Sequence, residues 1–338
     1  NPVGRALYVF DPALNPIKNK NGSNGFTGGL SLGANSSNSA GAYVNLYRVA
    51  TSGGRVFIGR FESGQAPIVE VNPADLDANF TPVLAAGKKA VSIDAIGRGE
   101  NLKLVMLDTD FAITEYDLGT AKTISSASRT FPKTNLSIVR TDADIAYDYE
   151  GGVWVNQHRN PPAGKEATIA HITKDGVDYH NVTAGLTHNA CDNGGIAVSP
   201  DGKLLAVVGA GNYKLTIYSI SKDASGKIAL KSEYVISTTG KTHTSLAWDY
   251  AGNLYAGNRN DETLKFYAIP YSGLVSTPCA SKYAFTLDAN SASASELNPF
   301  AYDLSSTWNS TSKTLTVNYS LNANATGVDI VIMDGKME

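Results

Sequence analysis

A segment that recurs roughly every fifty residues constrains the fold of this chain more than any other feature. The three clearest copies span Ile145–Val155, Ile196–Ala206 and Leu246–Ala256. Each copy is a short apolar run, a turn that contains glycine, and a second apolar run. Glycine is favoured in such turns because the backbone of a tight hairpin needs positive φ. Two weaker copies lie upstream, at 44–58 and 91–106.

Each copy continues into two further predicted strands. The third strands alternate apolar and polar residues and span 68–71, 112–116, 167–172, 215–220 and 264–269. The fourth strands are more polar and span 80–84, 125–131, 177–182, 230–236 and 282–287. The near-continuous apolar first strands indicate burial, and the alternating later strands indicate one face toward water. Four strands per repeat predict an all-β fold, a β-propeller of four-stranded blades whose inner strands line a central channel.

The run Gly195–Gly202, which reads GIAVSPDG, resembles the blades of the NHL, YVTN and gluconolactonase-like (regucalcin) propeller families. The resemblance covers about residues 43–288 and implies the fold, whereas many different activities share this architecture. Residues 6–10, followed by Asp11-Pro12, are typical of the third strand of another blade. Five repeats and this remnant predict six blades, with seven as the alternative.

The predicted domain organisation is a propeller over 1–288, a linker over 289–298 and a C-terminal part over 299–338. The C-terminal part contains predicted strands at 300–304, 314–321 and 328–333, and it resembles an Ig-like module. A segment of this length is too short for a whole sandwich of this kind. We therefore expect a partial module or strands that pack on the propeller. The alternative that these strands belong to the remaining blade stays open.

Composition excludes some classes of partner and favours an exported protein. Charged residues make up 17% of the chain and the formal net charge is -3. No clustered basic face is therefore expected, and no nucleic acid partner is predicted. No apolar run is long enough to predict a membrane span. Abundant Asn, Ser and Thr with little Lys and Glu favour an extracellular, cell-surface or periplasmic location. Cys191 and Cys279 form a disulfide in an oxidising compartment or remain two free thiols.

Polar side chains are predicted to gather at one mouth of the channel. In a propeller, the loops from second to third strands and the loops between blades share this face. Arginine forks and amide groups there can bind carboxylates or sugar hydroxyls. The predicted ligand-binding residues are Arg60, Asp108, Arg140, His158, Arg159, Asn193, Asn212, His243 and Arg259.

No cofactor is predicted, although the resemblance to gluconolactonase-like enzymes raises the question of a divalent metal. That resemblance implies a metal held by Glu, Asn and Asp residues at the channel. Here Asn193 lies one residue out of register, with Gly194 in its place, and the run VVGAG at 207–211 lacks the aspartate that ends the following strand. The aspartates Asp94, Asp148 and Asp249 recur at first-strand ends on the opposite face, where we expect them to close turns.

The sequence therefore favours a non-catalytic binding or scaffold propeller of a secreted or cell-surface protein, with a glycan or a protein as ligand at the loop face. No Gly-x-Ser-x-Gly, His-Glu-x-x-His or phosphate-binding Gly-Lys-Ser/Thr motif is present. The alternative is a propeller hydrolase or lyase that acts on sugar-derived substrates. His158, Arg159, Arg259 or His243 at the mouth would then carry the chemistry.

Overall fold

The structure is a computed structural model, and the part described here is mostly strand. It comprises residues 7–10, 15–24, 26, 46–61, 64–136, 143–157, 168–182, 195–209, 214–237, 243–249, 252–258, 263–269, 301–312 and 314–321. The regular elements in these ranges are β-strands and one short 3-10 helix, η2 (Gly99–Asn101).

Five antiparallel sheets follow one another along the chain, and in each sheet neighbouring strands are consecutive in sequence. Blade 1 contains β1 (Leu46–Ser52), β2 (Arg55–Arg60), β3 (Ile68–Val71) and β4 (Thr81–Pro82). Blade 2 contains β5 (Ala90–Ile96), β6 (Lys103–Asp108), β7 (Ile113–Asp117) and β8 (Arg129–Thr130). Blade 3 contains β9 (Asp144–Tyr147), β10 (Val153–Asn156), β11 (Thr168–Thr173) and β12 (Gly176–Asn181).

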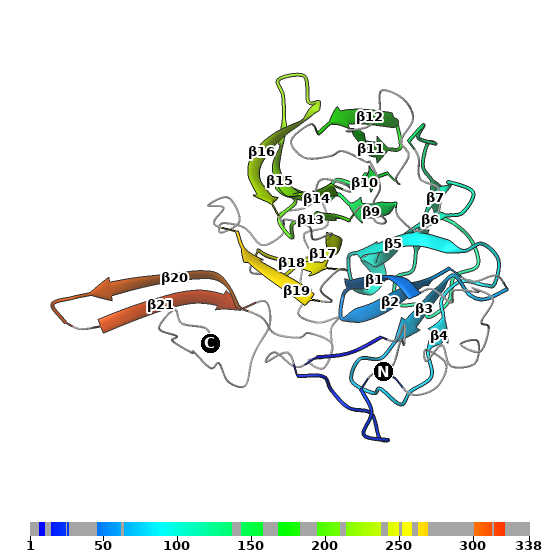
Figure 1. The fold of residues 1–338 in the computed structure, drawn as a ribbon, viewed down its shortest axis with the longest axis horizontal. Helices are drawn as coiled ribbons and strands as arrows, with labels where there is room; N and C mark the ends of the chain where they lie inside the picture. The colour runs from blue at the N-terminus through cyan, green and yellow to red at the C-terminus, as the bar shows by residue number, and fades with distance from the viewer. Residues whose placement is uncertain are drawn as a thin grey trace.

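Blade 4 contains β13 (Ile196–Val198), β14 (Leu204–Gly209), β15 (Lys214–Lys222) and β16 (Ile228–Ser237). Blade 5 contains β17 (His243–Trp248), β18 (Asn253–Asn258) and β19 (Thr263–Ala268). The first strands of successive blades are neighbours, with β5 between β1 and β9 and β13 between β9 and β17 (Figure 1). The first strand of each blade is therefore innermost, and the chain is an all-β propeller with five blades in the described residues.

The first, second and third strands of the five repeats are confirmed wherever they fall on described residues. The blade count of six, or seven, is not found there. Residues 7–10 do not form the third strand predicted for a sixth blade. Ile17 instead donates a backbone hydrogen bond to Val9, and Phe10 bridges to Pro16, so this segment pairs with its own continuation. The fourth strands β4 and β8 are two residues long, much shorter than predicted, whereas the predicted strand 282–287 lies outside the described residues.

Apolar side chains fill the space between consecutive blades, because each sheet packs its faces against its neighbours. Phe57 of blade 1 packs with Leu104 of blade 2, and Trp154 of blade 3 packs with Leu205 of blade 4. The aromatic residues Tyr147 and Trp154 are likewise buried in interblade clusters, on opposite faces of blade 3. The far face of blade 1 is covered in part by the N-terminal segment, since Leu7 and Phe26 pack there.

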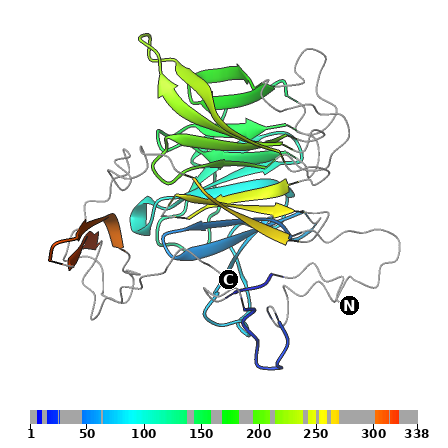
Figure 2. The same cartoon turned by 60° about the vertical axis from the view of Figure 1, so that its left-hand side comes forward.

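The C-terminal hairpin consists of β20 (Ala301–Asn309) and β21 (Thr314–Leu321). It stands apart from the blades in both views (Figures 1 and 2). The predicted strands at 300–304 and 314–321 correspond to this hairpin, although β20 is longer than predicted. The predicted strand 328–333 lies outside the described residues, so the Ig-like module stays a prediction. In the described ranges no helix is long and apolar enough to cross a membrane.

Candidate functional site

One residue near the start of the inner strand of each blade occupies an equivalent position at the channel mouth, and together these residues form a ring. Pairing with the second strands places Arg48 opposite Gly59, Ser92 opposite Leu107, and Asp144 opposite Asn156. Ser245 pairs with Gly257 in blade 5, and Gly195 accepts the backbone hydrogen bond of Val208 in blade 4. The residues at this position are Arg48, Ser92, Asp144, Gly195 and Ser245, which we call the Asp144 ring. Their shared register brings one position of each of the five blades to the same height.

Asp144 connects four blades through this ring. Its Oδ1 lies 2.9 Å from Arg48 Nε of blade 1 and accepts a hydrogen bond from Ser92 Oγ of blade 2 at 2.6 Å. Its Oδ2 accepts the backbone N–H of Ile196 in blade 4 at 3.3 Å. The side chains of Arg48 and Asp144 are 10% and 9% exposed. The carboxylate therefore ties together elements that are far apart in the sequence.

A second acidic residue lies two positions along the inner strand of blade 2 from Ser92. Asp94 Oδ2 accepts the backbone N–H of Tyr147 at 2.7 Å, and its Oδ1 accepts that of Ala95. It thus covers the open edge of β9, which corrects the prediction that it closes a turn. Burial raises the pKa of Asp94 to about 7 despite these two hydrogen bonds. Burial also raises the pKa of Asp144, against the opposing effect of Arg48 and Ser92.

An ion-pair cluster at the mouth joins the loop before β5 to the end of β6. Lys88 Nζ lies 2.7 Å from Asp108 Oδ2 and 3.3 Å from Asp110 Oδ2. Asp108 is 1% exposed, whereas Lys88 and Asp110 are exposed. The hydrogen bond to Asp108 raises the pKa of Lys88, and Asp110 adds to the effect. The lysine therefore keeps its charge at the rim of the channel.

The loop from β6 to β7 carries an exposed aromatic ring at this rim. Asp108 Oδ1 accepts the backbone N–H groups of Asp110 and Ala112, at 2.8 and 3.1 Å. The backbone N–H of Phe111 donates to the carbonyl of Asp108. Phe111 has φ of 64° and is 38% exposed. Left-handed backbone is costly for an aromatic residue, so the hydrogen-bonded turn holds this residue in a fixed place.

Two cations with aromatic partners lie at the mouth ends of blades 1 and 2, Arg60 at the end of β2 and Lys89 just before β5. The guanidinium of Arg60 lies 5.3 Å from the ring centroid of Phe80. Lys89 Nζ lies 5.0 Å from the ring centroid of Phe61. Such contacts orient the cations while leaving their charge in place. We call the following residues the blade 1–2 rim: Arg60, Phe61, Lys88, Lys89, Asp108, Asp110 and Phe111.

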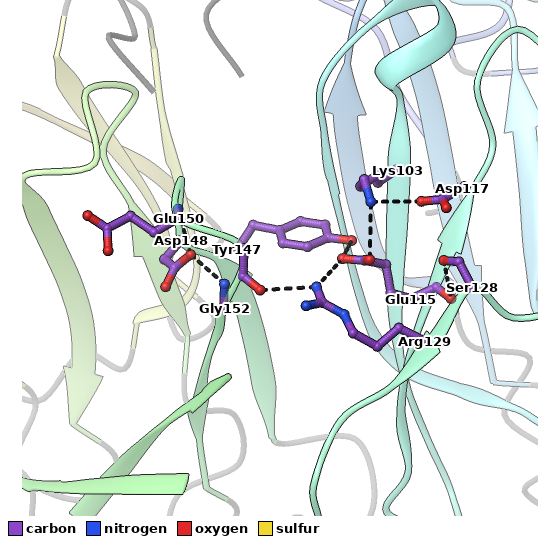
Figure 3. A network of polar contacts seen from close by, with 10 residues as sticks. Lys103, Glu115, Asp117, Ser128, Arg129, Tyr147, Asp148, Glu150 and Gly152 are labelled. Atoms are coloured by element: carbon purple, nitrogen blue, oxygen red, sulfur yellow. Dashed lines mark hydrogen bonds and ion pairs between the residues drawn. The ribbon is translucent and has the colours of Figure 1, made fainter. Parts of the chain in front are cut away.

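A polar network toward the opposite face joins blades 2 and 3 (Figure 3). Glu115, which is 3% exposed, accepts a hydrogen bond from Arg129 at 2.6 Å and one from the Tyr147 hydroxyl at 3.2 Å. Lys103 bridges Glu115 and Asp117, at 3.3 and 2.8 Å. Burial raises the pKa of Tyr147 well above its usual value, and the nearby Glu115 adds to this. The network links strands of blades 2 and 3 through the buried carboxylate of Glu115.

Blade 3 also contains a buried pair of His171 and Asp148 beside Trp154. His171 Nε2 contacts Asp148 Oδ2, and the centroid of the His171 ring lies 4.6 Å from that of Trp154. Asp148 Oδ1 accepts the backbone N–H groups of Glu150 and Gly152. Burial opposes the charge of Asp148, but the hydrogen bonds from His171 and the backbone outweigh it, so the pKa of Asp148 falls below its usual value. The turn-closing role predicted for Asp148 is confirmed.

Asp249 closes the equivalent turn of blade 5, as predicted, because its Oδ1 accepts the backbone N–H of Asn253 at 2.8 Å. In the described residues no three His, Cys, Asp or Glu side chains group so as to hold a metal ion.

Only part of the predicted ligand-binding set can be placed. Arg60 and Asp108 lie in the blade 1–2 rim, where both are buried and contact neighbouring side chains. His243 is the first residue of β17, at the end of the inner strand, rather than part of the preceding loop, and its role in binding stays a prediction. The remaining predicted residues lie outside the described ranges: Arg140, His158, Arg159, Asn193, Asn212 and Arg259. Sequence reasoning missed Arg48, Ser92, Asp144 and Phe111. The common register of the inner strands could have identified the first three. The short turn that follows Asp108 could have identified Phe111.

Together the blades and the channel mouth define the chain as a β-propeller. No protein-family model and no curated protein matches the sequence. Among solved structures 247 chains match. The chain is similar to regucalcin from Agrobacterium tumefaciens, a calcium-binding protein, at 13% identity and a TM-score of 0.44, over 67% of this chain and 72% of that chain.

Two further solved structures differ widely in what they are. Puromycin hydrolase matches at 15% identity and a TM-score of 0.38, over 64% of this chain. This chain spans only 36% of the length of that hydrolase. The β-propeller domain of Cps50 (Swd1) from Myceliophteria thermophila matches at 12% identity and a TM-score of 0.37, over 66% of this chain and 85% of that one. These similarities concern the fold and assign no activity.

Proposed function

We propose that this chain is a non-catalytic binding propeller that holds a glycan or a protein ligand at its blade 1–2 rim. Phe111 is the observation that supports the proposal most. Both the left-handed backbone of Phe111 and the exposure of its aromatic ring are energetically unfavourable. The turn around Asp108 nevertheless holds Phe111 in this conformation. Such features concentrate at ligand-binding positions, and aromatic rings are frequent anchors in interfaces and platforms for sugars.

The surroundings of Phe111 support recognition of a polar ligand. Lys88 and Asp110 are exposed beside it and offer donors and acceptors of both charges. The Asp144 ring makes the blades a stiff support, which lowers the entropic cost of binding. An extracellular, cell-surface or periplasmic location fits such a ligand. The hydrolase or lyase alternative depends on His243 and on three residues outside the described ranges, His158, Arg159 and Arg259.

The test compares Phe111→Ala with Phe10→Ala on glycan arrays and on surface proteins from the source organism. Phe10 is a suitable control because it is also an exposed phenylalanine, at 52%, but it lies in the N-terminal segment. We expect Phe111→Ala to weaken binding at least about tenfold, or about 1.4 kcal/mol, while Phe10→Ala binds as the wild type does. Equal binding by all three proteins, or no ligand for the wild type, would reject the proposal.

A further inference from the structure

Blade 5 exposes a position that its counterparts in other blades bury. Each residue of the Asp144 ring lies opposite a residue of the second strand of its blade. In blades 1, 2, 4 and 5 that second-strand residue pairs on its other side with a residue of the third strand. Gly59 pairs with Ile68, Leu107 with Ile113, Val208 with Leu215, and Gly257 with Leu264. Ile68, Ile113 and Leu215 are at most 2% exposed because they pack on the next blade. Leu264 of blade 5 is 56% exposed.

Blade 1 also exposes an apolar position that is buried in other blades, on the face that would meet a preceding blade. The residue that follows the ring position faces the preceding blade, and Ile93, Ile145 and Ile196 are each 3% exposed there. Val49 holds this position in blade 1 and is 54% exposed. The two ends of the blade series therefore present uncovered apolar residues. Among the described residues the ring is open at a seam between β17–β19 and β1, which we call the blade 5–1 seam.

The N-terminal segment covers only the outer part of blade 1. Leu7 and Val9 pack, with Phe26, on Ile58 and Val69 of β2 and β3. Val49, on the inner strand β1, stays uncovered. What the seam lacks beside β1 is thus an inner pair of strands rather than an outer one.

The hairpin β20–β21 has the properties of such an inner pair. The inner strands of blades 1 to 5 begin at residues 46, 90, 144, 196 and 243, and β20 begins at residue 301, at a similar interval after β17. Asn309 Oδ1 accepts the backbone N–H groups of Thr311 and Ser312, much as Asp148 closes the first turn of blade 3. The sequence of β21 also alternates Leu315 and Val317 with threonines. An isolated two-stranded sheet is only marginally stable in water.

We infer that β20–β21 is the inner hairpin of a sixth blade and docks in the blade 5–1 seam of its own chain. One face of the hairpin then covers Leu264 and the other covers Val49, while the N-terminal segment lies outside it. Two chain segments from opposite ends of the sequence thereby close the ring. Docking places the hairpin, which stands apart from the blades in Figure 1, next to β1 and β17–β19.

The first test compares the thermal stability of Val49→Arg with that of a control variant, Val235→Arg. Val235 is 47% exposed on β16 of blade 4, so its environment matches that of Val49 in the open ring. If the hairpin covers Val49 in solution, Val49→Arg lowers the Tm by about 5 °C or more, whereas Val235→Arg shifts it by about 1 °C or less. The same Tm for both variants and the wild type would overturn the inference.

The second test uses the unmodified protein, so it tests docking of the hairpin even if Val49→Arg does not fold. Amide hydrogen exchange is followed at β20 and β21 and, for comparison, at β9 and β10. Docking predicts protection of both pairs of strands, because a docked hairpin exchanges only when the ring opens. Immediate exchange of β20 and β21 in a folded protein would overturn the inference. So would a dimer by light scattering that Val49→Arg dissociates, because the hairpin would then dock in a second copy.

Discussion

Replacing Asp144 with alanine tests whether one carboxylate at the channel mouth holds the blades together. The variant leaves the guanidinium of Arg48, 10% exposed, without its opposite charge. It also removes the acceptor for the Ser92 hydroxyl and for the backbone N–H of Ile196. Three contacts from three other blades are lost with a single side chain.

The expected cost follows from the burial of the pair. Removing one partner of a buried ion pair costs about 3–5 kcal/mol, mostly because the remaining charge stays buried. Burial raises the pKa of Asp144 and so already disfavours its charge. The expected loss therefore lies at the lower end of that range, at about 3 kcal/mol. The exposed pair Lys174–Asp175 supplies the control, since Asp175→Ala should cost less than about 1 kcal/mol.

Urea unfolding measures both losses, provided that the slope of free energy against urea is unchanged. A double-mutant cycle with Arg48→Met separates the ion pair from the other contacts. Because the two neutral replacements together leave no buried charge, the double variant should be more stable than Asp144→Ala alone. A loss below about 1 kcal/mol for Asp144→Ala, or additive effects in the cycle, would refute the role assigned to this residue.

Two further predictions concern single groups between or within blades. The pKa of Asp94 is raised from its usual 3.8 to about 7 by folding, so the folded state binds an extra proton between these values. Stability should therefore fall as pH rises through this window, by about 1.4 kcal/mol per pH unit at most. Asp94→Asn should flatten that slope in urea titrations from about pH 4 to 8, and an unchanged slope would contradict the assignment. Gly152→Ala should cost about 1–3 kcal/mol, because a Cβ would lie 2.5 Å from Asp148 Oδ2 and 2.6 Å from His171 Nε2. Gly176→Ala, with nothing within 4 Å, should be neutral in the same thermal melts, and equal melting of the two variants would count against the contact.

The repeat made the blades predictable because a hairpin is a local structure. An apolar run, a glycine turn and a second run specify β9–β10, β13–β14 and β17–β18 without reference to the rest of the chain. The fourth strands were predicted less well. β4 is two residues long and contains Pro82, which has no backbone N–H to donate to a neighbouring strand.

The site was less predictable because its contacts cross blades. Polarity marked Arg60 and Asp108 for the mouth, but the sequence does not show that Arg60 faces Phe80 or that Asp108 pairs with Lys88. Asp144 is one aspartate in an apolar strand, and its three partners become neighbours only when the inner strands are aligned. The strand pairings of the structure supply that alignment. The ring could therefore be identified from the structure but not from the amino-acid composition.

The Asp144 ring and the open seam are related features of one architecture. In a closed propeller every blade is supported on both sides, but within the described residues blade 1 packs on blade 2 and, on its outer part, on the N-terminal segment. Arg48 gives blade 1 a further support, because it reaches across the channel mouth to Asp144 of blade 3 instead of to an adjacent blade. A charge pair at the ring therefore restrains the blade that borders the seam. The blades can keep their order, and the rim around Phe111 its shape, whether or not a sixth blade is in place.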